Sequence, residues 1–91
     1  MNARPTDAAW LAAHLAEHSG EWVDLASILR ASFAERGYGL TVHSRVAELR
    51  TRRGLVIENR TWRNDAGRTV SEYRLVAVAV GEQARLEEVA S

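Results

Sequence analysis

The sequence predicts an α+β domain in which three helices are combined with a small antiparallel sheet. Apolar residues recur at helical spacing in three segments within residues 7–53. Beyond residue 54 the hydrophobic period changes from 3.6 to 2, which is typical of strands. A polar turn at 64–67 then separates two strand-like segments.

The first two helices are predicted from apolar spacing and from capping residues. Residues 7–18 carry Leu11 and Leu15 four apart, and Thr6 or Asp7 is a suitable cap. Residues 21–23 are long enough for a short edge strand only. Asp24 is expected to cap a second helix over 25–35. Its apolar face should hold four side chains at spacings of three and four: Leu25, Ile28, Leu29 and Phe33.

The third helix is expected over 42–53, with Thr41 as its cap and Gly54 at its end. Residues 55–63 are rich in β-branched residues and predict a strand. Asn64 to Gly67 predict a turn, with a glycine suited to left-handed backbone, and 68–75 predict the returning strand.

The order helix, short strand, helix, helix, strand, turn, strand is that of a winged helix-turn-helix domain, in which a β-hairpin forms the wing. We assign residues 1–76 to this domain. Residues 77–91 form a C-terminal extension, predicted to continue the last strand and end in a short helix with Leu86 and Val89 on one side.

Charge is unevenly distributed although the formal net charge is zero. The balance is −2 over residues 1–40, +4 over 41–74 and −2 over 75–91. Positive charge therefore gathers on the third helix and the hairpin, the elements with which such a domain would contact a nucleic acid.

The third helix combines a buried side with a short polar side. Val42, Val46, Leu49 and Arg53 fall on one side at 100° per residue. Ser44, Glu48 and Thr51 fall opposite, with the small Ala47 beside them and with His43, Arg45, Arg50 and Arg52 on the flanks. Such a face suits a helix that enters the major groove, because no bulky apolar side chain blocks the base edges. A solvated helix surface would show the same pattern.

Three arginines surround the predicted turn and give the hairpin tip a positive charge that suits phosphates or a minor groove. Arginines would also serve a hairpin that is merely soluble. The candidate DNA-binding residues are Thr41, His43, Ser44, Arg45, Glu48, Arg52 and Arg53 on the third helix, and Arg60, Arg63 and Arg68 on the hairpin.

Several short motifs resemble a family of small helix-turn-helix proteins common in phages and prophages. They are the stretch from Val42 to Arg50, then Gly54, the run Ile57-Glu58-Asn59-Arg60, and Tyr73-Arg74-Leu75. The resemblance covers about residues 7–76. It implies a winged-helix fold and a DNA-binding role, as a transcriptional regulator or an accessory DNA-binding protein.

Other functional classes find little support in the sequence. His14 and His18 have the i, i+4 spacing of a zinc pair but lack a clear further ligand, so we expect no metal site. His43 and Ser44 are adjacent on a helix and point about 100° apart, so they do not form a nucleophile–base pair. We expect no enzyme activity, no cofactor, no membrane span and a cytoplasmic location.

Two alternatives to DNA binding remain: a winged-helix module that binds proteins only, and RNA binding through the same surface. A homodimer held by the extension 77–91 is a further expectation, because specific DNA sites are usually read by two copies. The extension could equally pack back on its own domain. Trp10 and Trp22 are expected in the core, and Trp62 on the hairpin.

Overall fold

The computed structural model describes residues 5–76, which form three helices and a three-stranded antiparallel sheet. The α+β class is thereby confirmed. In chain order the elements are α1 (Asp7–Glu17), β1 (Val23–Asp24), α2 (Leu25–Arg36), α3 (Val42–Arg52), β2 (Ile57–Arg63) and β3 (Thr69–Leu75). Within residues 5–76, each predicted helix and strand is present, with ends shifted by two residues or fewer. The predicted extension, 77–91, lies outside the described residues.

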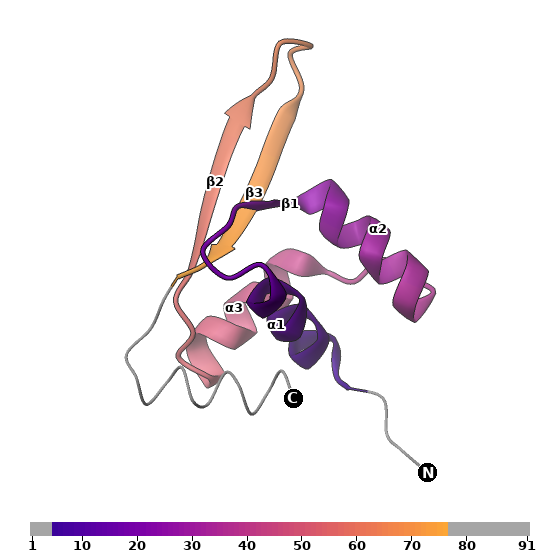
Figure 1. Cartoon of the computed structure of the whole chain (residues 1–91), viewed down its shortest axis with the longest axis vertical. Helices are drawn as coiled ribbons and strands as arrows, with labels where there is room; N and C mark the ends of the chain where they lie inside the picture. Colours follow the sequence, from indigo (N-terminus) through magenta and orange to yellow (C-terminus); the bar gives the residue numbers. More distant parts are fainter. Residues whose placement is uncertain (1–4, 77–91) are drawn as a thin grey trace.

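The sheet has the order β1-β3-β2, so the short edge strand pairs with the last strand. Ile57 opposes Leu75 at the foot of the hairpin, and Arg63 opposes Thr69 near its tip. β1 covers only Tyr73 and Glu72 of β3. The outer half of the hairpin therefore has no third strand and projects beyond the helices (Figure 1).

The turn at the hairpin tip is built around Asn64. Its side-chain Oδ1 accepts hydrogen bonds from the backbone N–H groups of Ala66 and Arg68, each at 3.0 Å. Gly67 has a φ of 77°, the left-handed conformation predicted for this position. This local network fixes the direction in which the tip residues emerge.

One hydrophobic core joins all three helices to the foot of the sheet. α1 contributes Leu11 and Leu15, both almost fully buried. α3 contributes the predicted set Val42, Val46 and Leu49. The sheet contributes side chains from one face only, which are Val23, Ile57, Tyr73 and Leu75. Since side chains alternate along a strand, this face is the inner face and the opposite one is the outer face.

Two of the three predicted helix caps form. The side chains of Thr6 and Asp24 accept hydrogen bonds from Ala9 N and Ser27 N, at 3.1 and 3.0 Å. Thr41 occupies the N-cap position of α3, but its side chain makes no capping hydrogen bond. Its ψ of 85° departs from the extended values of 163° and 150° at Thr6 and Asp24. The prediction of a Thr41 side-chain cap was therefore wrong.

α2 packs through a narrower stripe than its apolar spacing predicts. Ile28 and Ser32 are fully buried, whereas Leu25 and Leu29 are partly buried and Phe33 is 61% exposed. The placement of Phe33 in the core was wrong, because only one side of α2 meets the rest of the domain. Ser32 Oγ donates to the carbonyl of Tyr38 and accepts from Leu40 N, so it holds the connection between α2 and α3.

Candidate nucleic-acid interface

The exposed face of α3 is short and centred on Ala47. His43, Ser44, Ala47 and Thr51 are all exposed there. The hydroxyl of Thr51 is turned to its own helix, where it donates to the carbonyls of Ala47 and Glu48. The face therefore offers no bulky apolar side chain, as the sequence predicted, and it lets another molecule approach the helix backbone closely.

Arg45 and Glu48 lie on a side of α3 that is partly covered, and they pair with each other. Arg45 Nη1 lies 3.4 Å from Glu48 Oε1, and both residues are half-buried. The pKa of Asp7, at the start of α1, is lowered mainly by a hydrogen bond from the Tyr38 hydroxyl, and the charge of Arg45 makes the smallest contribution. The exposed face is therefore centred away from these two residues, whereas the sequence placed Glu48 within it and Arg45 at its edge.

Three arginines follow at the end of α3 and have different roles. Arg50 Nε donates to the carbonyl of Ile57 at 3.0 Å and ties the helix to the start of β2. Arg52 is exposed, and Arg53 is half-buried at the C-cap. Within residues 5–76, neither Arg52 nor Arg53 is in an ion pair, so their charges are available to a ligand.

On the hairpin, Arg60 points to the outer face, away from the core and α3. Its guanidinium carbon lies 4.2 Å above the centre of the Trp22 ring, and its Nε donates to Glu72 Oε1 at 2.8 Å. Arg74 lies 4.5 Å from the same ring and pairs with Glu58. Arg60 is thus part of a stacked, ion-paired cluster rather than a free cation.

Two tryptophans, Trp22 and Trp62, belong to this outer face. Trp22 is half-buried beneath the two arginines and lies outside the core, so its predicted core position was wrong. Trp62 is exposed on the hairpin, where its Nε1 donates to Glu72 Oε1 at 2.6 Å. Hydrogen bonds from Arg60 and Trp62 hold the pKa of Glu72 below its ordinary value.

Arg63 and Arg68 are the exposed cations of the hairpin tip. Side chains alternate between the two faces of a strand, and Arg63 lies an even number of residues after the buried Ile57 in β2. Arg63 therefore belongs to the inner face, the side of the sheet on which α3 lies. Arg68 follows the Asn64 turn directly. Among the described residues no carboxylate pairs with either of them. The hairpin tip extends away from α3 (Figure 1), so the two basic regions are separated along the molecule.

Ion pairing leaves the predicted positive charge of residues 41–74 in place. Eight arginines and four carboxylates lie in this range. Three of these arginines pair with three glutamates, and each pair has no net charge. Five arginines remain against Asp65, so the unpaired charge is still +4. It is carried by the end of α3 and the hairpin tip.

His14 and His18 lie at the end of α1 with their ring centroids 5.5 Å apart. His14 stacks on Trp10 with ring centroids 5.1 Å apart, and its Nε2 is buried without a hydrogen-bond partner. Burial lowers the pKa of His14. Residues 5–76 contain no group of three or more side chains placed to hold a metal ion, and no helix in this range is long and apolar enough to cross a membrane.

Comparison with protein-family models, with curated proteins and with solved structures found no match. The resemblance to phage helix-turn-helix proteins therefore remains a prediction from the sequence motifs.

Proposed function

We propose that this protein is a winged helix-turn-helix protein that binds double-stranded DNA through α3 and the hairpin. The element order, the three-stranded sheet and the projecting hairpin are compatible with this fold. The observation that carries the proposal is the unpaired charge of +4, which is confined to the two elements with which winged helices contact DNA. A regulatory or accessory role is the one that the sequence resemblance implies.

In this arrangement α3 faces the major groove. His43 and Ser44 are the exposed polar side chains at its start, and Ala47 permits close approach to the base edges. Thr41, with its hydroxyl unused in capping, stands beside them at the entrance to the helix. Arg45 and Glu48 pair with each other and are half-buried, so we assign them a positioning role rather than direct base contacts.

The free arginines hold the phosphate backbone at two places. Arg52 and Arg53 act at the end of α3, and Arg63 and Arg68 act at the hairpin tip. β2 spans six residue steps from Ile57 to Arg63, so the tip reaches about 20 Å beyond the foot of the sheet. That length equals about six base pairs of B-DNA, which carries one charge per ~1.7 Å of axis, so both regions can touch one duplex.

Fluorescence anisotropy of a labelled mixed-sequence duplex, measured against salt concentration, tests the proposal. Four phosphate contacts predict a slope of log K against log salt of about −3.6, which is roughly a 150-fold loss of affinity between ~50 and ~200 mM salt. The double variant Arg63→Ala/Arg68→Ala should reduce the slope by about 1.8.

Arg60→Ala/Arg74→Ala is the matched control, because it removes the same charge from the outer face of the same hairpin. Its slope should stay near that of the parent. Equal losses in the two double variants would contradict contact through the inner face. A single-stranded RNA of the same length in parallel would show whether RNA is preferred.

The alternative function is a protein-interaction module without nucleic-acid binding. The net charge of zero and the exposure of Phe33 and Trp62 favour it. Absence of salt-dependent binding to any duplex at ~50 mM salt would support this alternative over the proposed function.

A further inference from the structure

The middle of the exposed face of α3 lacks the side chains that usually read bases through two hydrogen bonds. Those side chains are Arg or Lys for guanine, Asn or Gln for adenine, and Asp or Glu for cytosine. Within α3, Arg45 and Glu48 pair with each other, and Arg50 donates to the carbonyl of Ile57. Arg52 stands in the last turn, next to the C-cap. The middle of this face therefore has no free side chain of the kind that discriminates bases by paired hydrogen bonds.

Two methyl groups occupy that place instead. Ala47 and Thr51 are both exposed, and they lie one helical turn apart, about 40° around α3 and about 6 Å along it. The Thr51 hydroxyl donates to the carbonyls of Ala47 and Glu48, at 3.0 and 3.3 Å. Because its hydroxyl is held against the helix, Thr51 presents its methyl group to the outside, on the same face as the Cβ of Ala47.

A methyl group matches one feature of the major groove. Of the four bases, only thymine carries an apolar group there, its C5 methyl, and the methyl groups of alanine and threonine are among those that pack on it. Successive bases of one strand are about 3.4 Å apart, so a spacing of about 6 Å is close to two base steps. Arg52 and Arg53 follow directly and are in no ion pair among the described residues, so they can hold the phosphates beside the groove.

We infer that α3 reads thymine through its C5 methyl group, with Ala47 and Thr51 each packing on one of two thymines that lie two positions apart in one strand. This inference rests on the proposed function, because it names the base that the proposed interface prefers. Each buried methyl group contributes about fourfold to affinity, so loss of both thymine methyl groups should weaken binding roughly 15-fold.

Replacement of thymine by uracil tests the inference, because uracil differs only in lacking the C5 methyl group. Fluorescence anisotropy compares binding of the full chain to a labelled duplex of alternating A and T, whose thymines lie two positions apart in each strand, and to the same duplex with uracil for every thymine. The thymine duplex should bind roughly 15-fold more tightly. Equal affinities would overturn the inference and leave DNA binding intact, whereas no binding to either duplex at ~50 mM salt would refute the proposed function itself.

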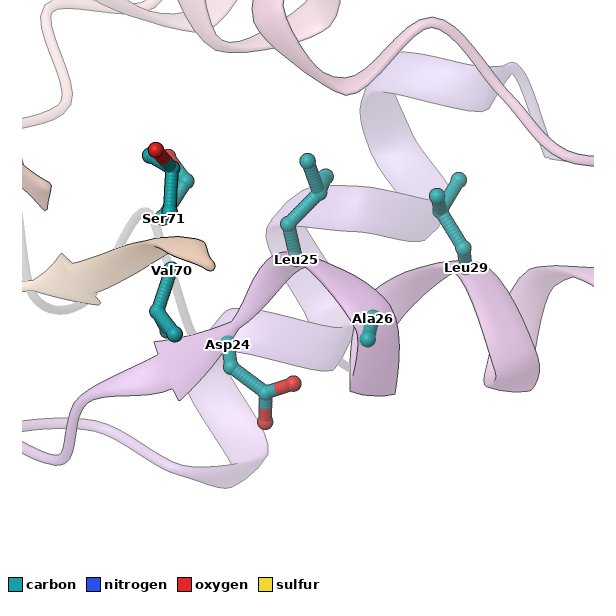
Figure 2. Close-up of a pocket in the computed structure, with 7 residues that line it drawn as sticks. Asp24, Leu25, Ala26, Leu29, Val70 and Ser71 are labelled. Atoms are coloured by element: carbon teal, nitrogen blue, oxygen red, sulfur yellow. The ribbon is translucent and has the colours of Figure 1, made fainter. Parts of the chain in front are cut away.

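Thr51→Ser assigns the contact, because it removes the methyl group and keeps the hydroxyl that bonds to the helix. Its preference for thymine over uracil should fall to about fourfold, with the affinity for the uracil duplex unchanged. Ala26→Ser is the matched control and should keep the full preference. Ala26 is also exposed on a helix, but it lies on α2 beside a groove with β3, with its side chain turned away from Leu25 and Leu29 (Figure 2). An undiminished preference in Thr51→Ser would overturn the assignment of the methyl contact to α3.

Discussion

The hydroxyl of Ser32 should contribute to the stability of the domain although the side chain is small. It is fully buried and makes two hydrogen bonds with the connection that leads to α3. Ser32→Ala leaves the Leu40 N–H and the Tyr38 carbonyl without this partner. A net hydrogen bond contributes about 1 kcal/mol, and an unsatisfied buried group costs about 1–3 kcal/mol. We therefore expect a loss of about 2 kcal/mol in the free energy of unfolding.

Urea denaturation followed by tryptophan fluorescence measures this loss. With a slope of about 1 kcal/mol per molar, typical of the smallest proteins, the midpoint should fall by about 2 M. Thermal unfolding should shift by about 8–16 °C. Ser44→Ala, an exposed serine on α3, is the control and should change stability by less than about 0.5 kcal/mol. An equally small effect of Ser32→Ala would refute the assigned role of its hydroxyl.

Two further predictions concern His14 and Arg60. Burial lowers the pKa of His14 below 6.5, so the unfolded chain binds a proton first as the pH falls. Stability should therefore decrease from about pH 6.5 down to the lowered pKa of the folded state, and His14→Leu should flatten this part of a stability–pH curve measured by urea denaturation. Arg60→Met should lower the free energy of unfolding by about 1 kcal/mol, because it removes a cation–π contact with Trp22 and an exposed ion pair with Glu72. An unchanged urea midpoint for Arg60→Met would show that the stacked cluster adds nothing to stability.

The secondary structure could be predicted because the residues that begin and end each element are next to it in the sequence. Asp24 caps α2, Gly54 follows α3, and Asn64 with Gly67 closes the hairpin, each through contacts within a few residues. The buried side of α3 followed from the spacing of Val42, Val46 and Leu49.

The sequence did not reveal how much of each apolar face its neighbours would cover. Phe33 follows the apolar spacing of α2, yet no element of the described chain packs over it. The hairpin posed a similar problem. Val56 and Ile57 are both apolar, so the local pattern does not decide whether the alternate residues that include Val56 or those that include Ile57 face the core. Only the packed fold separates Arg63, on the inner face, from Arg60, which stacks on Trp22.

The exposed face of α3 was misjudged for a related reason. The sequence places Glu48 opposite the buried side, but Glu48 is half-buried and pairs with Arg45 one turn earlier on the same helix. Burial and ion pairing in the folded chain therefore decide which of the candidate residues are free to meet a ligand.

One measurement tests DNA contact through α3 and the inner hairpin face most directly. The 15N-labelled full chain is titrated with a short duplex, and the chemical shifts of its backbone amides are recorded at each step. The account predicts shifts at Ser44 and Ala47 on α3 and at Arg63 and Gly67 near the hairpin tip, with little change at Ala26 and Phe33 on α2. Shifts confined to α2, or none at low salt, would contradict it.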